Sequence, residues 1–152
     1  MRVSAKVDYA VRAAVALAVM GDGSPVKGER IATEQGIPLK FLENILGDMR
    51  RAGLVASQRG AEGGYRLAVA AEDITVATII RAVEGPLGDV RGMAPEAVEY
   101  QGSAEGLKDV WLAARATLRE VLETVTVADI AAKSRPPVIR DLLDDPEAWV
   151  RR

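Results

Sequence analysis

Apolar side chains recur at helical spacing from residue 5 to residue 20, in a run that holds neither Gly nor Pro. Ser4 stands directly before this run, where a side-chain oxygen can cap a helix. The same periodicity predicts helices over about 27–35, 38–52 and 75–84. A glycine follows each of these runs, as expected where helices end. This part of the chain is therefore predicted to be mainly helical.

The apolar periodicity changes from helical to alternating after the third predicted helix. Tyr65, Leu67 and Val69 alternate with small or charged residues, which predicts a half-buried strand. Its partner strand is predicted over 54–58, and the connecting loop over 59–63 begins with Arg and is rich in Gly. A hairpin directly after two short helices is the order of a winged helix-turn-helix. The predicted fold class is mainly α (α+β), with a small β-hairpin as the wing.

No periodic pattern is present over 86–103, which predicts a long loop. The clearest periodicity of the chain follows over 107–125, where apolar residues are spaced 4, 3, 4, 3 and 4 apart. This seam predicts a long helix that packs within its own subunit or pairs with a second one. A capping box at Thr126 and Asp129 opens a short last helix, and the tail over 134–152 is expected to be loosely held. The residues of the seam, for which we favour dimerisation, are Leu107, Trp111, Ala114, Leu118, Val121 and Val125.

Composition narrows the classes of function. The 152 residues include neither Cys nor His, which excludes disulfides, zinc sites built on these ligands and Ser-His-Asp triads. No apolar run approaches the roughly 18 residues of a membrane span, and the start lacks a signal-peptide core, so a cytoplasmic protein is expected. Residues 1–70 hold 10 basic and 7 acidic residues, whereas 71–152 hold 10 and 15. The mildly basic first half is weak support for nucleic-acid binding.

The two helices over 27–52 have the size and the turn of a helix-turn-helix motif. Gly36 suits a left-handed turn, and Ile45 is placed to fill the interface between the helices. An ordinary helical hairpin shares these features, so the motif alone leaves both interpretations open. The wing favours DNA binding, because Arg59 at its Gly-rich tip can reach phosphates or the minor groove. Without the context of the wing, Arg59 would be interpreted more simply as a solvated side chain on an ordinary turn.

A resemblance to a known family is carried by IPLKFLENIL (37–46), AGLVASQRG (52–60), GGYRLA (63–68) and the opening SAKVDYA (4–10). These segments resemble the Rrf-type winged helix-turn-helix regulators, which include iron–sulfur cluster assembly regulators, nitric-oxide-sensitive repressors and cysteine-metabolism repressors. The resemblance extends to about residue 133 and implies a homodimeric DNA-binding protein, usually a repressor, whose long helix crosses to the partner subunit. At the position of Pro38, the first residue of the implied DNA-contacting segment, relatives commonly have a small polar residue instead. The implied DNA-binding residues are Pro38, Leu39, Lys40, Phe41, Arg59 and Gly60.

The resemblance also bears on metal binding. Relatives that carry an iron–sulfur cluster have three cysteines in the loop after the fourth helix. This chain has none, and Gly92, Val98 and Ala104 stand near the expected positions. The acidic fourth ligand of some relatives has a counterpart in Asp8, which alone cannot hold a cluster and is better explained as a partner of the helix dipole. The resemblance therefore implies a cluster-free member with no cofactor and no metal site.

These observations predict a sequence-specific DNA-binding regulator of transcription. Its expected parts are a winged-helix DNA-binding domain over 1–85, a sensor-type loop without cysteines over 86–103, a dimerisation helix with a short following helix over 104–133, and the tail over 134–152. The expected partners are double-stranded DNA and a second copy, without a membrane, and the effector is left open between a small molecule and a protein. One alternative is a winged-helix module that binds protein and never DNA, which the net acidity favours. The other is an enzyme, for which no catalytic constellation is present.

Overall fold

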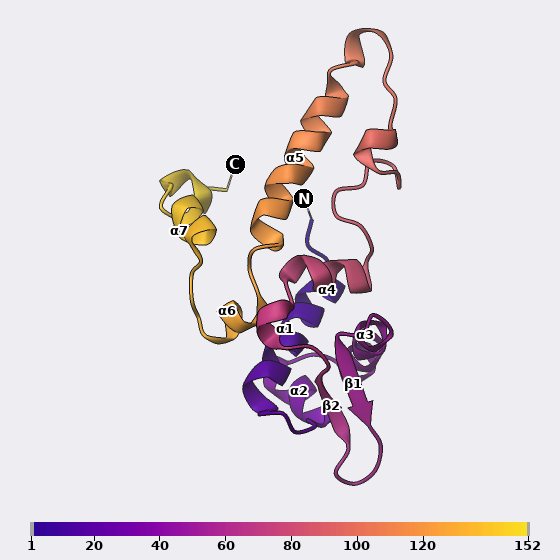
Figure 1. Ribbon diagram of the computed structural model, residues 1–152, viewed down its shortest axis with the longest axis vertical. Helices are drawn as coiled ribbons and strands as arrows, with labels where there is room; N and C mark the ends of the chain where they lie inside the picture. Colours follow the sequence, from indigo (N-terminus) through magenta and orange to yellow (C-terminus); the bar gives the residue numbers. More distant parts are fainter. Residues whose placement is uncertain (1, 152) are drawn as a thin grey trace.

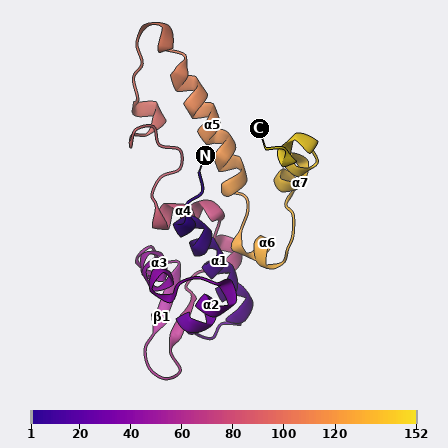
Figure 2. The same cartoon turned by 180° about the vertical axis from the view of Figure 1, so that it is seen from behind.

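The computed structural model describes residues 2–151, which form an elongated molecule (Figures 1 and 2). The first four helices and the β-hairpin gather in one region. The fifth helix extends away from this region, with the preceding loop on one side and the last helix on the other. The elements are α1 (Ala5–Met20), α2 (Gly28–Gln35), α3 (Leu39–Arg51), β1 (Val55–Gln58), β2 (Gly64–Leu67), α4 (Val76–Val83), α5 (Leu107–Leu122), α6 (Val127–Ala131) and α7 (Pro137–Leu143).

Hydroxyl caps determine where three of the helices begin. The side chains of Ser4, Thr75 and Thr126 each accept a hydrogen bond of 3.1 Å from the backbone N–H three residues later. The capping box predicted at Thr126 is confirmed, because the Asp129 carboxylate accepts in return from the Thr126 N–H at 3.0 Å. That backbone hydrogen bond is also the main reason why the pKa of Asp129 lies below its usual value.

The turn between α2 and α3 has the predicted left-handed glycine. Gly36 has φ +61°, and the N–H of Ile37 donates to the carbonyl of Ala32 at 3.0 Å, which closes the end of α2. Pro38 then stands as the N-cap of α3, with φ −57°. α3 therefore begins at Leu39, one residue later than the sequence predicted.

The hydrophobic core lies where α1 meets the other helices of the first half. α1 contributes Ala10, Ala13 and Ala14, which are fully buried. Such small side chains let α2, α3 and α4 approach α1 closely, and all three contact it. The larger volume comes from the inner face of α3, whose fully buried residues are Leu42, Ile45, Leu46 and Met49. This core fixes α3 with its other face outward.

The predicted hairpin is confirmed. β1 and β2 pair antiparallel, with Val55 opposite Leu67; β1 begins one residue later and β2 ends two residues earlier than the alternation suggested. Val26 extends the pairing on the other edge of β2. Its N–H and carbonyl exchange two hydrogen bonds of 2.7 Å with Tyr65, so the wing is tied to the segment that leads into α2.

The second half of the chain departs from the sequence prediction in two places. α5 ends at Leu122, so Val125 of the predicted seam lies beyond the helix, where its carbonyl accepts from the Val76 N–H at 3.0 Å. The tail, which was expected to be loosely held, contains α7 and a following 3₁₀ turn (Pro146–Trp149), and none of its described residues is buried. Pro137 occupies the first position of α7, which proline favours, and this signal was available in the sequence.

The loop between α4 and α5 is irregular, as expected, apart from short 3₁₀ turns at Pro95–Ala97 and Gly102–Ala104. The first turn packs on α5, and Pro95 and Val98 are fully buried beside it. Across the described chain, no helix is both long enough and apolar enough to cross a membrane.

Candidate nucleic-acid interface

The outer face of α3 is polar and accessible. The Lys40 side chain is 88% exposed, with its Nζ 3.8 Å from the Glu43 carboxylate. Asn44 is exposed on the same face, and Pro38 is exposed directly before the helix. In the major groove, Lys can donate to guanine, Glu can accept from cytosine, and Asn can bind adenine. This face therefore carries groups that can read base edges, and the sequence interpretation missed Glu43 and Asn44 among them.

The other two predicted residues at the start of α3 are partly packed. The Phe41 ring meets the Tyr9 ring edge-on, with centroids 5.7 Å apart and planes at 81°. Leu39 packs against Gly28: a Cβ added at Gly28 would lie 3.6 Å from the Cδ1 atom of Leu39. Both side chains keep just over a third of their surface exposed, 38% for Phe41 and 36% for Leu39. They can offer apolar contact to a groove, whereas Lys40 alone projects freely.

The wing presents one unpaired cation at its tip. Arg59 is exposed, and within the described residues it has no ion pair or hydrogen bond from its side chain. Gly60 follows with φ +101° and open space around its Cα, so nothing blocks a close approach to a phosphate. Arg50, near the end of α3, donates to the Ser57 hydroxyl at 3.0 Å and joins α3 to the wing. The sequence interpretation missed this residue.

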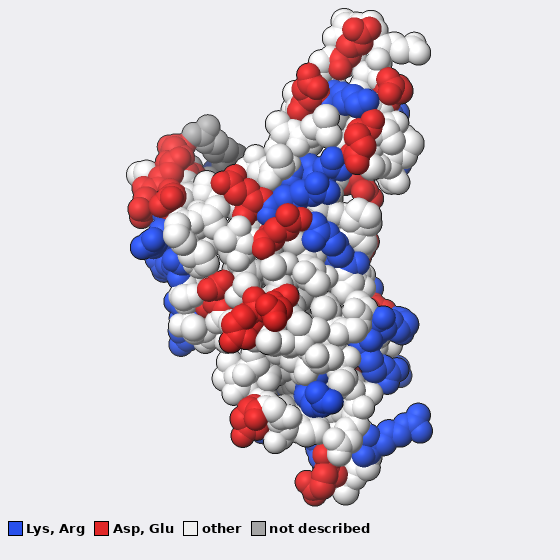
Figure 3. Space-filling model, in the orientation of Figure 1, with Lys and Arg blue, Asp and Glu red and all other residues white. Residues whose placement is uncertain are grey.

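Basic side chains gather along one edge of the molecule, with a few acidic side chains among them (Figure 3). On the face in Figure 3, blue Lys and Arg side chains line the edge formed by α3 and the wing. Red side chains are more frequent over α5 and the C-terminal elements. The weak charge asymmetry of the sequence is therefore concentrated in space, although the formal net charge is −2.

Lys6 on α1 holds α3 in place. Its Nζ lies 2.8 Å from Oδ2 of Asp48 on α3 and donates to the carbonyl of Val83 at the end of α4, at 2.7 Å. Arg51 forms a second ion pair with the same carboxylate. The hydrogen bond from Lys6 is the largest cause of a lowered pKa at Asp48. One lysine thus joins three helices.

A second cation on the same helix fixes the turn of the motif. The guanidinium of Arg12 donates to the backbone carbonyl of Gln35, and its Nε donates to the Gln35 side chain at 3.2 Å. Arg12 also lies over the Tyr9 ring, 5.3 Å from its centroid, and pairs with Asp8 at 3.1 Å. Asp8 is therefore engaged with Arg12, rather than standing free as a ligand.

Five of the six predicted dimerisation residues lie on α5, and Val125 lies beyond its end. No residue of α5 is buried in the described chain. Leu107 and Trp111 are 36% and 39% exposed, Ala114 is exposed, and Leu118 and Val121 are half-buried. Trp111 donates from its indole to the Tyr100 hydroxyl at 3.0 Å. The sequence interpretation did not include Val110 among the dimerisation residues, although its side chain is 54% exposed.

Comparison with known proteins identifies the relatives of the chain. The sequence profile of Rrf2, described as an iron-dependent transcriptional regulator, matches residues 3–133. The chain belongs to the Rrf2 family of transcriptional regulators. It is 46% identical over 145 residues to the putative HTH-type transcriptional regulator Rv1287 of Mycobacterium tuberculosis, covering 95% of this chain and 90% of that protein. It is 33% identical to the HTH-type regulator CymR of Bacillus subtilis, covering 87% and 91%.

Solved structures agree with this assignment. The structure of CymR, the global cysteine regulator of B. subtilis, superimposes with a TM-score of 0.74 at 32% identity, covering 88% of this chain and 98% of that one. The IscR of T. potens gives a TM-score of 0.69 at 34% identity, covering 100% and 93%. The protein is a DNA-binding transcriptional regulator of winged-helix type, and its family is not one of enzymes.

The residues of this chain do not fit an iron–sulfur cluster. The sequence has no Cys and no His, which are the usual ligands of such clusters. Among the described residues, no group of three or more acidic side chains could hold a metal ion. Near the positions where cysteines were expected, Val98 is fully buried and apolar, and Gly92 and Ala104 carry no donor side chain.

Proposed function

We propose that the protein is a homodimeric repressor that binds a palindromic operator. The observation that carries this proposal is α5, a helix of 16 residues with none of them buried. Helices in proteins are stabilised mainly by packing an apolar face rather than by their intrinsic propensity. A second copy of α5 would supply the missing packing.

The apolar residues of α5, none of which is buried, support this pairing. Leu107, Val110 and Trp111 lie within one turn of the helix, and Ala114 and Val121 follow at spacings of three and seven residues. This arrangement resembles the narrow apolar seam of a coiled-coil pair. A symmetric pair presents two recognition helices, which matches a palindrome of two half-sites.

Each subunit is proposed to contact DNA through the start of α3 and the wing tip. Lys40 is assigned to a base edge, Leu39 and Phe41 to apolar groove contacts, and Pro38 to the approach of the backbone. Arg59 and Gly60 are assigned to phosphates or the minor groove. We place the protein in the cytoplasm, where the DNA of its bacterial relatives lies.

The experiment measures binding of the purified protein to duplex DNA. The operator is found by genomic mapping of bound sites, and the palindrome, one half-site and a scrambled duplex are compared by fluorescence anisotropy over a range of salt concentrations. The proposal expects tight binding to the palindrome only, with affinity that falls steeply as salt rises. Equal binding to the half-site and the palindrome would contradict the dimer. Absence of salt-dependent binding would favour a protein-binding module.

A further inference from the structure

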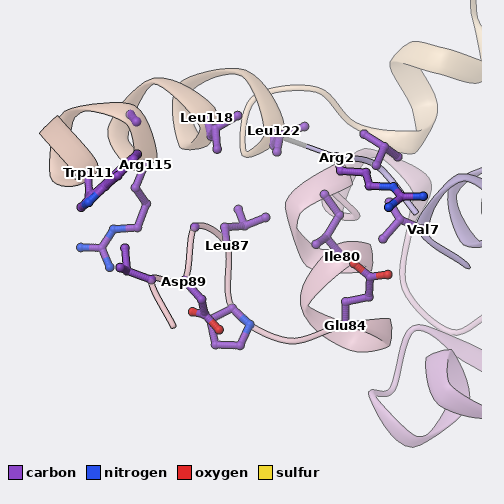
Figure 4. A pocket seen from close by; sticks show the side chains of 15 residues that line it. Arg2, Val7, Ile80, Glu84, Leu87, Asp89, Trp111, Arg115, Leu118 and Leu122 are labelled. Atoms are coloured by element: carbon purple, nitrogen blue, oxygen red, sulfur yellow. The ribbon is translucent and has the colours of Figure 1, made fainter. Parts of the chain in front are cut away.

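A cavity of about 350 Å³ lies between the DNA-binding region and α5 (Figure 4). Its walls come from the N-terminal segment, α1, α4, the 86–90 loop and α5. The lining is mostly aliphatic, and one edge is the ring of Trp111. Cavities of this volume are at the small end of those that bind small molecules. The main apolar lining residues are Val7, Ile80, Leu87, Leu118 and Leu122.

The wall of the cavity is built by specific contacts. Gly88 has φ +75°, and an added Cβ would lie 3.0 Å from Cγ of Arg115, so a larger residue would be strained and would push the Arg115 side chain aside. The Arg115 side chain is 12% exposed and pairs with Glu96 at 2.6 Å. Leu87 is 8% exposed, which fixes the loop between α4 and α5.

Four charged side chains line the cavity, and two of them are engaged elsewhere. Glu84 accepts a hydrogen bond from the Ser4 hydroxyl, and Arg115 forms an ion pair with Glu96. Within the described residues, Arg2 and Asp89 have neither an ion pair nor a side-chain hydrogen bond. In Figure 4, Arg2 lies toward α4 and Asp89 lies on the loop. An apolar space with one free positive and one free negative group is complementary to a ligand with the opposite arrangement.

We propose that this cavity binds a small effector with an apolar body and opposite charges at its two ends, the class that includes ω-amino acids and short apolar peptides. The carboxylate of the ligand pairs with Arg2, its ammonium pairs with Asp89, and its body packs on Leu87 and Leu118. The residues near which relatives have cysteines, Gly92 and Ala104 among them, do not line the cavity. The site is therefore separate from the expected cluster position.

A series of hydrogen bonds and one ion pair links the cavity to α3. Glu84 follows the end of α4 and holds Ser4, which caps α1. Lys6, in the first turn of α1, bonds the Val83 carbonyl and the Asp48 carboxylate on α3. A ligand that repositions Arg2 and the end of α4 therefore acts on the ion pair that orients α3. This coupling rests on the proposed function, whereas binding to the cavity does not.

Trp111 supplies the measurement. The chain has two Trp residues, so Trp149→Phe leaves the cavity Trp as the only one. In this background, the full-length protein is titrated with 8-aminooctanoate, octanoate and octylamine, and Trp111 fluorescence is followed. We expect a saturable change, with 8-aminooctanoate bound at least about threefold more tightly than either singly charged probe, since partly exposed ion pairs contribute little each.

Two variants test the assignment of charges. Arg2→Gln should remove the advantage of 8-aminooctanoate over octylamine, and Asp89→Asn should remove its advantage over octanoate. Arg135→Gln, an exposed substitution outside the cavity, should change neither. Equal affinities for the three probes, or no saturable change, overturn the proposal. Loss of probe binding as the protein concentration is raised through the dimerisation range shows that a second copy fills the cavity and also overturns it.

The coupling has its own test. Saturating 8-aminooctanoate should change operator affinity at least about twofold, and Lys6→Met should abolish this change while leaving the probe affinity intact. If the wild type binds the operator equally tightly with and without saturating 8-aminooctanoate, the coupling is overturned. Operator binding without probe tests the proposed function separately, so the two failures are distinguishable.

Discussion

Lys6 and Asp48 form an ion pair of 2.8 Å that joins α1 to the recognition helix. Both side chains are largely shielded, with 34% of Lys6 and 20% of Asp48 exposed. Arg51 pairs with the same carboxylate from the next turn of α3. The orientation of α3 therefore depends on charge as well as on the apolar residues beneath it.

Asp48→Asn should lower the free energy of unfolding by about 0.5–1 kcal/mol at pH 7, because the ion pair is lost but partly screened. The folded-state pKa of Asp48 is lowered, chiefly by the Lys6 hydrogen bond. The contribution is therefore present above the ordinary carboxylate pKa of about 4 and is lost as the pH falls through the lower folded-state value. Urea unfolding measures the difference between variant and wild type at each pH. A difference that stays constant below pH 4, or an equal effect of Asp22→Asn in the exposed turn after α1, would contradict this account.

Arg59→Ala should weaken operator binding and reduce the salt dependence by about one counterion per subunit, since one phosphate contact is removed. Lys40→Ala should instead change base preference, by about 1–3 kcal/mol at the contacted position if it reaches a guanine edge. Salt titrations of both variants on operator and scrambled duplex separate the two effects. Unchanged affinity and slope for Arg59→Ala on both duplexes would show that the wing does not touch DNA.

Val110→Glu should dissociate the proposed dimer, with at least about a 100-fold rise in its dissociation constant, because each subunit would bury a like charge. Val110 is the cleaner site for this test, because Leu118 also lines the cavity beside α5. Val19→Glu, at a 62% exposed valine on α1, is the matched control. Sedimentation that finds Val110→Glu still dimeric would place the interface elsewhere.

Gly64→Ala should detach the wing from the segment before α2. An added Cβ would lie 2.5 Å from the carbonyl oxygen of Val26, which is backbone and cannot move aside without breaking the pairing with Tyr65. We expect a loss of roughly 2 kcal/mol in unfolding free energy and weaker operator binding. Gly23→Ala shares a positive φ but has nothing within 4 Å, so thermal unfolding of both separates the clash from backbone strain. Equal losses would rule out the clash.

Protein purified without oxygen should be colourless, with no stoichiometric iron or sulfide, because the chain has no thiolate or imidazole. Visible absorption and iron analysis after anaerobic incubation with iron and sulfide provide the measurement. A reproducible absorption band with stoichiometric iron would require a ligand set without Cys or His and would overturn the cluster-free assignment.

Local signals in the sequence determined most of the first half of the fold. The hydroxyls at Ser4, Thr75 and Thr126 and the glycine at position 36 act through hydrogen bonds and backbone angles that span only a few residues. The alternation around Tyr65 likewise predicted the wing. The absence of Cys and His settled, from composition alone, that ordinary cluster ligands are missing.

Only the tertiary structure decided how these elements act together. Periodicity placed Trp111 and Leu118 on one face of a helix, but their surroundings depend on a loop more than 20 residues earlier in the chain, which lines the same open cavity as both. The link between Lys6 and Asp48 spans 42 residues and has no signature in either helix. Contacts of this kind depend on how whole elements pack, because side chains distant in sequence meet only after the core has fixed the helices in space.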